Sequence, residues 1–377
     1  MDTTKHVDSR RGFIKKLGAA GLYASTLGIP TLSSAFEQKQ SHFSRINPVN
    51  VSRERIIRQV VGLRPYRPAG FNLSVEQLEN KTIIHNYGHG GGGISLSWGT
   101  ASLAIDQIKQ PEYTPVGVLG AGVVGLSSAI LLLKRGTPVT IYTENLPPNT
   151  TSNVAAAFWA PVSVYDPGQV NELFVNTFNQ ASQISQRMFQ DLVGKRYGVW
   201  WMKTFFMQAP FDFPGGKNLY PDYKKHNTDS SPFGHISNPE ELHSLMIEPP
   251  IYMKALLDDF FQLGGKLVIR KMQKPTDILE LNEQTIINCT GLGSHKLFGD
   301  KTLIPVKGQL SILLPQAEIN YGYVNLTPGG LLYMFPRQDG IILGGSSEKG
   351  VASLNADSQE TERILKGHQY ISQNLKG

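Results

Sequence analysis

The chain has 377 residues, enough for two or three domains with sizeable cores, which excludes a peptide or a small module held together by staples. Hydrophobic residues make up 40% and charged residues 18%, a balance typical of a globular chain. A single cysteine, Cys289, excludes an internal disulfide and a multi-thiolate metal site. Half of the net charge of +6 lies in residues 1–35, so the remainder lacks the charge expected of a nucleic-acid-binding surface.

The first 35 residues resemble a twin-arginine export signal. Arg10 and Arg11 precede a modestly apolar stretch over residues 17–32, and small residues up to Ala35 offer a cleavage site. Glycines and a proline interrupt the stretch, which falls short of a continuous membrane span. The export machinery of this route carries folded proteins. We therefore expect a bacterial protein that works in the periplasm or outside the cell and meets a membrane only during export.

A polar linker is predicted at 36–50, and the structured body is predicted to begin near residue 51. The expected elements up to residue 142, in chain order, are a helix end leading to a strand at 51–61, an extended proline-rich stretch at 63–68, a strand at 81–86, a glycine-rich turn at 88–93, a helix at 94–108, a second linker at 110–114, a strand at 115–119, a glycine turn at 120–125, a helix at 126–135 and a strand at 139–142. The last four form the start of a βαβ unit.

The middle of the chain, residues 166–249, is rich in aromatic residues and loops and shows no clean period, so we interpret it mostly as a second domain. The elements expected after it are a helix at 250–263, strands at 266–270, 285–288, 303–314, 331–336 and 340–343, and a terminal helix at 357–375. The three later strands are typical of an antiparallel sheet.

A dinucleotide fingerprint lies at the start of the βαβ unit. Gly120, Gly122 and Gly125 have the spacing at which the backbone turns tightly, approaches a pyrophosphate and packs helix against strand, with Val123 opening the helix. Glu144 closes the next strand, where a carboxylate can accept both hydroxyls of a ribose. The fingerprint predicts a bound dinucleotide but does not separate NAD from FAD.

The segment at 147–161 favours FAD. It offers hydroxyl groups for a pyrophosphate, followed by small residues that let a flat ring lie against the backbone. Here the chain resembles the D-amino-acid oxidase family of flavoenzymes, in which a similar run of threonines and a Val-Ala-Ala-Gly run occupy this place. Ala157 replaces the family's glycine. The resemblance implies cofactor contacts at Asn145, Thr150, Thr151, Ser152, Ala156, Ala157, Phe158, Met272, Cys289, Thr290 and Gly291.

Two further family motifs precede the fingerprint. Residues 62–68 are similar to the family's Gly-x-Arg-Pro-x-Arg-Pro element, whose first arginine, here Arg64, holds the substrate carboxylate. A planar guanidinium suits that task because it binds a carboxylate through two hydrogen bonds. Residues 85–95 are similar to the element that closes around the flavin ring, which implies contacts from Gly90, Gly91, Gly93, Ile94 and Ser95.

The histidines of this second element, His85 and His89, have the i, i+4 spacing of a zinc pair, but the flanking glycines preclude the helix that such a pair requires. We therefore expect no metal site. Tyr333 matches the family tyrosine that also meets the substrate carboxylate. A second family tyrosine, on a mobile lid, falls on Gly329, where the turn is shorter. Trp200, Trp201, Phe205 and Phe206 are left without an assigned role.

The implied fold class is α/β, with a Rossmann-like FAD-binding domain built from discontinuous segments and an α+β substrate domain with an antiparallel sheet. We assign residues 51–109, 115–165, 250–300 and 340–377 mainly to the FAD-binding domain, and 166–249 and 301–339 mainly to the substrate domain.

The implied reaction is oxidation of a D-amino acid to an imino acid, with oxygen reoxidising the flavin to give hydrogen peroxide. The partners are then a small amino acid and oxygen. Two alternatives stay open: a dehydrogenase or an oxidase of glycine or N-methyl amino acids on the same scaffold, and an exported flavin-binding protein without turnover.

The motif order is unusual. In the family the glycine fingerprint opens the chain and the arginine-proline and glycine-rich elements close it, whereas here Arg64 and Gly90 precede Gly120. This order predicts a circular permutation in which residues 51–108 have moved to the front. It also predicts that the terminal helix ends close to residues 46–51 and that both glycine turns meet one cofactor.

Overall fold

The computed structural model describes residues 46–208, 211–234 and 236–375. The predicted export signal and most of the predicted linker lie outside these residues. The end of that linker is part of the folded body, because Ile46 and Val49 are buried against helix α7 (Ser358–Gln373). The folded body therefore includes residues before the predicted start at 51.

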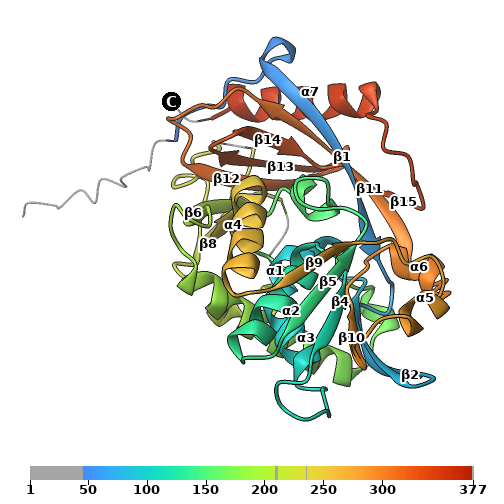
Figure 1. Ribbon diagram of the computed structural model, residues 1–377. Coiled ribbons are helices and arrows are strands. Elements are labelled where there is room, and N and C mark those ends of the chain that lie inside the picture. Colours follow the sequence, from blue (N-terminus) through green and yellow to red (C-terminus); the bar gives the residue numbers. More distant parts are fainter. Residues whose placement is uncertain (1–45, 209–210, 235, 376–377) are drawn as a thin grey trace, which may run out of the picture. The chain divides into compact units, whose positions relative to one another are not determined.

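The first of two sheets has six strands in the order β2-β3-β10-β4-β5-β9 (Figure 1). All pairings are parallel except that of β2 with β3. The strands are β2 (Asn72–Leu78), β3 (Lys81–Tyr87), β4 (Val116–Leu119), β5 (Val139–Thr143), β9 (Lys266–Ile269) and β10 (Thr285–Asn288). The short central strands β4 and β10 are wholly buried, as expected of parallel strands covered on both faces. This is the predicted Rossmann-like layer.

Helices cover both faces of this sheet. Helices α1 (Gly93–Ile105) and α2 (Val123–Lys134) pack on one face, α3 (Glu172–Asp191) packs on α1, and α4 (Pro249–Gln262) packs on α2. Because α1 and α2 are enclosed on nearly all sides, their sequences are apolar all round. The short helices α5 (Thr276–Leu279) and α6 (Gly293–Leu297) contribute to a separate core on the opposite face.

The second sheet has nine strands in the order β1-β11-β14-β13-β12-β6-β8-β7, with β15 paired to β11. It is antiparallel except for the pairing of β6 with β12. The strands are β1 (Ile56–Tyr66), β6 (Val199–Phe206), β7 (Lys224–Lys225), β8 (Glu240–Ile247), β11 (Ile304–Leu313), β12 (Tyr321–Thr327), β13 (Gly330–Arg337), β14 (Gly340–Gly344) and β15 (Glu348–Lys349). Helix α7 lies across one face of it, over β13 and β14 (Figure 1).

The structure divides the chain between the two sheets differently from the sequence-based assignment. Strands β1 and β14 and helix α7 belong to the nine-stranded sheet, although their segments were assigned mainly to the FAD-binding domain. Helix α3 lies in the segment assigned to the substrate domain but packs against α1 of the six-stranded layer. The reason is long-range pairing, since the membership of β1 is set by β11, about 250 residues later, with Ile56 opposite Leu313.

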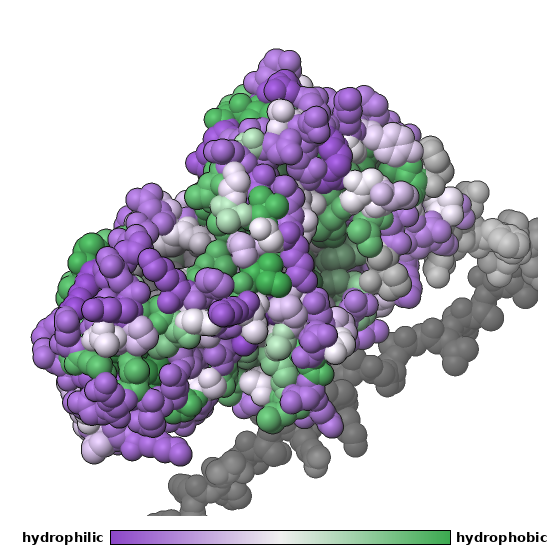
Figure 2. Space-filling model, turned by 90° about the vertical axis from the view of Figure 1, so that its right-hand side faces the viewer, coloured by the Kyte–Doolittle hydropathy of each residue, from purple (hydrophilic) through white to green (hydrophobic). Residues whose placement is uncertain are grey.

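Within the described part of the chain, none of the helices is both long enough and apolar enough to cross a membrane. Hydrophilic side chains predominate on the face shown in Figure 2, and apolar side chains gather where that face is hollowed.

Candidate functional site

A cavity of about 1120 Å³ lies where the carboxyl ends of the parallel strands meet one face of the nine-stranded sheet. This volume exceeds the range of about 300–1000 Å³ typical of sites for one small ligand, so the cavity can hold a large cofactor together with a substrate. With one exception, Gly125, the site residues predicted from the sequence line it: Arg64, Gly90, Gly91, Gly93, Ile94, Ser95, Gly120, Gly122, Val123, Glu144, Asn145, Thr150, Thr151, Ser152, Ala156, Ala157, Phe158, Met272, Cys289, Thr290, Gly291 and Tyr333.

The first glycine turn joins β4 to α2. Gly120 has a φ of +99°, and a Cβ there would stand 2.8 Å from the carbonyl oxygen of Cys289. Gly125 lies behind the cavity wall, where a Cβ would stand 2.0 Å from the carbonyl oxygen of Gly120. Gly125 therefore lets the helix pack on the strand, as the fingerprint predicts, but it does not line the cavity as a cofactor contact would. The amino terminus of α2, at Val123, is left facing the cavity and favours a negatively charged group.

Glu144 directly follows β5 and lines the cavity. Its half-exposed carboxylate forms an ion pair with Lys271, and Asn145 and Met272 also line the cavity. A carboxylate at the end of the second strand of a βαβ unit is placed to accept ribose hydroxyls. The amino terminus of α2 and the carboxylate of Glu144 together fit a dinucleotide, which has a pyrophosphate and a ribose.

Residues 150–158 run between the two sheets as an extended segment with a short 3₁₀ turn at Thr151–Val154. The hydroxyl of Ser152 accepts a hydrogen bond from the Val123 N–H at 3.0 Å, which brings this segment against the amino terminus of α2. Ala157 has a φ of +60°, a conformation that glycine adopts more readily. The alanine thus keeps the backbone angle that the family's glycine would favour.

The strained backbone at Ala157 is fixed from the nine-stranded sheet. Its carbonyl accepts a hydrogen bond from the Ile247 N–H of β8 at 2.9 Å, and the Ala155 carbonyl accepts one from Arg337 Nη1 of β13 at 3.1 Å. Arg337 is itself buried and paired through two N–H groups with Asp339. Sequence reasoning missed Arg337, whose place after Pro336 at a strand end gave no sign of a contact with a segment 180 residues earlier.

Cys289 lines the cavity beside α2. Burial is the main cause that raises the pKa of its thiol to about 12, and a weak contact with Ser128 Oγ opposes that shift only slightly. The thiol is therefore protonated at neutral pH and has the character of a small apolar group.

The second glycine turn follows β3 and leads into α1 through a 3₁₀ turn at Gly90–Gly92. Gly91 N–H donates to the carbonyl of Ser163 at 3.0 Å, and a Cβ at Gly90 would stand 2.3 Å from that same oxygen. The glycines are needed because residues 162–164 pass directly over them. The turn and the amino terminus of α1 face the same cavity as Gly120.

The two histidines of this element have separate partners. His85 hydrogen-bonds Glu76 and Asn288, while His89 bonds Thr100, and burial lowers the pKa of His89 to about 3. Among the described residues no group of three or more His, Cys, Asp or Glu is arranged to hold a metal ion.

Arg64 and Tyr333 meet on the cavity face of the nine-stranded sheet, although 269 positions separate them in the chain. Arg64 Nη1 donates to the Ser346 carbonyl at 3.4 Å. Desolvation raises the pKa of Tyr333, and this effect outweighs the charge and hydrogen bond of Arg64, which lower it. The phenol therefore stays protonated and can donate a hydrogen bond beside the guanidinium.

Two glycines of the sheet make room for this pair. A Cβ at Gly308 would stand 2.5 Å from Arg64 Nη2, and a Cβ at Gly344 would stand 2.3 Å from the Tyr333 ring. Sequence reasoning missed both, although a glycine inside a strand pattern marks close approach of another group. Around them the wall is apolar, formed by Phe158, Phe206, Leu310, Val324, Leu331 and Phe335.

Of the four aromatic residues without an assigned role, only Phe206 lines the cavity. Trp200 donates its indole N–H to Glu248, and Phe205 is buried in the core beneath α7.

The fold and the cavity together define an FAD-dependent oxidoreductase. The family model described as "FAD dependent oxidoreductase" matches residues 115–226 and 235–374, and the chain belongs to this family. Residues 46–114, which carry Arg64 and the second glycine turn, lie outside the match.

Among relatives, the chain is 28% identical over 260 residues to a D-amino-acid oxidase of Dictyostelium discoideum, covering 68% of this chain and 72% of that protein. It is 29% identical over 259 residues to a D-aspartate oxidase of Homo sapiens, covering 66% and 73%. Among solved structures, its fold is similar to that of glycine oxidase from Geobacillus kaustophilus, with a TM-score of 0.51, 14% identity and coverage of 70% and 80%.

The residues present fit FAD. The amino terminus of α2 suits a pyrophosphate and Glu144 suits a ribose, while the glycine turn at 90–93, which no side chain fills, leaves bare backbone beside the cavity. Residues 155–158 are those that the family resemblance assigns to the flavin ring, and they line the same cavity as Arg64 and Tyr333.

Proposed function

We propose that this protein oxidises the α-amino group of D-amino acids. The observation that supports this most is the meeting of Arg64 and Tyr333 beside an apolar wall of the cavity. A bidentate guanidinium beside a phenol that can donate is suited to a carboxylate, and the small residues 155–157 leave room for a flat ring opposite. Relatives that oxidise D-amino acids support the same reading.

When bound, FAD supplies the redox chemistry, accepting two electrons and a proton from the amino acid and passing electrons to oxygen to give peroxide. The chain supplies position. Arg64 and Tyr333 would hold the carboxylate and so fix the orientation of Cα, and the walls at Phe158 and Phe335 would exclude water. No side chain of the site is assigned as a base, because the neutral amine needs none.

The test is an anaerobic titration of the purified yellow protein. Bleaching of the flavin by D-amino acids but not by L-amino acids is expected, with stoichiometric peroxide when air is readmitted. Bleaching only by glycine or N-methyl amino acids would show that these compounds, and not D-amino acids, are the substrates. Bleaching without peroxide would indicate a dehydrogenase. A flavin that no amino acid bleaches would contradict enzymatic function.

We also propose that the chain is a circular permutation of the family pattern. The terminal helix and the first described residues are in contact, since Gln369 Nε2 donates to the Val51 carbonyl at 3.1 Å and Ile46 shares a core with Ile371. The family match that begins at 115 and ends at 374 supports this arrangement.

A third proposal is that the protein is exported through the twin-arginine route with FAD already bound, and that it works in the periplasm or outside the cell. Replacing Arg10 and Arg11 with lysine is expected to leave the protein in the cytoplasm with its flavin bound. Fractionation and flavin absorbance give the answer, and continued export of flavin-free protein would contradict the proposed order of loading and export.

A further inference from the structure

The hairpin between β12 and β13 forms an edge of the substrate end of the cavity. Thr327 pairs with Gly330 across a turn made by Pro328 and Gly329, and Thr327 Oγ1 donates to the Gly330 carbonyl at 2.9 Å. The next residue, Leu331, faces the cavity, as does Tyr333 two residues later. The position of this turn therefore sets where both side chains stand.

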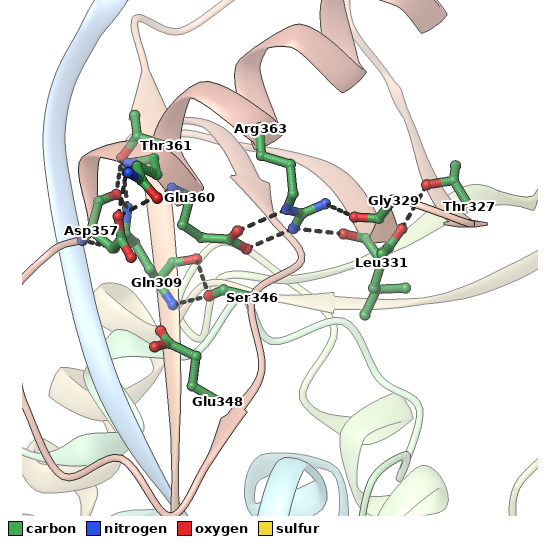
Figure 3. Close-up of polar contacts among 12 residues, drawn as sticks. Gln309, Thr327, Gly329, Leu331, Ser346, Glu348, Asp357, Glu360, Thr361 and Arg363 are labelled. Atoms are coloured by element: carbon green, nitrogen blue, oxygen red, sulfur yellow. Dashed lines mark hydrogen bonds and ion pairs between the residues drawn. The ribbon is translucent and has the colours of Figure 1, made fainter.

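Arg363 of α7 holds the turn from behind (Figure 3). Its Nη1 donates to the Gly329 carbonyl at 3.1 Å, and its Nη2 donates to the Leu331 carbonyl at 3.3 Å. The other side of the guanidinium is paired with Glu360 through Nε at 2.7 Å and Nη2 at 2.6 Å. The carboxylate fixes the plane of the guanidinium, so its remaining N–H groups are aimed at the two carbonyls.

The turn is shaped to receive this guanidinium. Gly330 has a φ of +112°, and a Cβ there would stand 3.2 Å from Arg363 Nη1. A larger residue at 330 would be strained by its backbone angle and would crowd the arginine.

Helix α7 is itself well anchored, so Arg363 is a fixed point. The Asp357 side chain caps the first turn by accepting from the N–H groups of Gln359 and Glu360. The buried amide of Gln309 on β11 joins this end to the sheet, since Nε2 donates to the Asp357 carbonyl and to Thr361 Oγ1 while Oε1 accepts from the Asp357 N–H (Figure 3).

We propose that Arg363 is a positioning residue for the reaction. It does not line the cavity, but by holding the carbonyls of Gly329 and Leu331 it makes the hairpin a fixed rim, so that Leu331 and Tyr333 keep their places around the substrate. Binding and release then require no opening of this hairpin. The inference rests on the proposed function for its kinetic part and on hydrogen bonding alone for its structural part.

The experiment compares the flavin-loaded wild type with Arg363→Met, Arg363→Lys and the control Arg53→Met. Arg53 forms an ion pair with Glu362, which lies on α7 next to Arg363, but Arg53 is exposed and does not contact the hairpin. Amide hydrogen exchange of residues 327–331, the KM and kcat for D-alanine, and the dissociation constant of FAD are measured for each.

In Arg363→Met we expect exchange at 327–331 to accelerate at least about tenfold, because two hydrogen bonds to the turn are lost. KM is expected to rise about fivefold or more, with kcat and FAD affinity within about twofold of wild type. Arg363→Lys should recover little, since an ammonium group cannot reproduce the planar fork. The control should match the wild type in all three measurements.

Unchanged exchange at 327–331 in Arg363→Met would overturn the proposal, whatever the activity. Faster exchange throughout the nine-stranded sheet, or weakened FAD binding, would overturn it in favour of a general structural role. If the wild type itself oxidises no amino acid, the proposed function fails, and the exchange result still decides whether Arg363 fixes the rim.

Discussion

The left-handed backbone at Ala157 stores strain in the segment that lies between the two sheets. A non-glycine residue in this conformation costs about 1–2 kcal/mol of strain. Glycine removes that strain, but its greater freedom in the unfolded chain cancels part of the gain in stability. We expect Ala157→Gly to raise the free energy of unfolding by about 0.5–1 kcal/mol, measured by urea denaturation of the flavin-free protein. The matched control is Ala156→Gly, where φ is negative and glycine should destabilise. Equal destabilisation by both changes would contradict the strain.

Arg64 carries the strongest expectation about catalysis. Arg64→Ala removes a charge-assisted bidentate contact worth about 1.5–3 kcal/mol, so kcat/KM for a D-amino acid is expected to fall at least about tenfold while FAD still binds. Arg64→Lys should rescue little, because an ammonium group lacks the planar pair of donors and because the space beside Gly308 is occupied by the guanidinium of Arg64. Steady-state kinetics and flavin fluorescence give the two readouts. An unchanged kcat/KM would remove Arg64 from the substrate site.

At the scale of elements, a buried carboxylate joins three strands of the nine-stranded sheet. Glu241 of β8 bonds His226 at 2.8 Å and lies 3.5 Å from Lys203 of β6 and Lys224 of β7. Burial is the largest single effect and raises the pKa of Glu241. The His226 hydrogen bond and the lysine charges together outweigh it and lower the pKa to about 2.

A carboxyl pKa lower in the folded than in the unfolded state stabilises the protein above the ordinary value near 4.5, and that stability is lost as pH falls toward 2. We expect Glu241→Gln to lower the free energy of unfolding by about 3 kcal/mol at pH 7, because the surrounding cations lose their partner. The deficit should shrink between pH 4.5 and pH 3 in urea titrations. Asp258→Asn, which breaks an exposed pair with Lys254, should change little at any pH. A deficit that is constant with pH would contradict the role of the ionised group.

The elements that carry a strong local signal could be predicted from the sequence. The glycine turn at Gly120 lies between an apolar strand and an apolar helix, and these neighbours predicted a tight turn from strand to helix. Helix α3 was missed although its apolar residues recur with a clear helical period, with Phe178, Ala181 and Phe189 on the buried face, because loops and aromatic residues dominate the rest of 166–249. The sheet to which β1 belongs was also beyond the sequence, since it depends on a pairing partner far along the chain.

The candidate site divides in the same way. Glu144 was located by its type and its spacing from the glycine fingerprint, whereas Arg64 was located by the resemblance of residues 62–68 to a family motif. The residues that support them were not, because Gly308, Arg337 and Arg363 act through contacts between segments that are separated in the sequence.

For the whole molecule, the proposed circular permutation predicts that the chain can be relinked. A variant that starts at residue 115, runs to 375 and continues through about eight Gly and Ser residues into 46–109 should fold, bind FAD and keep kcat/KM within about threefold of the natural chain. The segments to be joined already lie together, since Gln369 bonds Val51 and Leu375 packs against the core that includes Ile46, and the new opening lies in the short turn at 110–114. Circular dichroism, flavin absorbance and kinetics provide the measurements. A relinked chain that cannot hold flavin would contradict the permutation.

Strand β10 lies between β3 and β4 at the centre of the six-stranded sheet, yet it follows β4 by more than 160 residues. A ribosome adds roughly 5–20 residues per second, so β3 and β4 wait on the order of ten seconds or more for the strand that joins them. During this interval the nascent chain exposes two apolar strand edges and has no complete cradle for a nucleotide. FAD can therefore bind only late in synthesis, after most of the chain has left the ribosome.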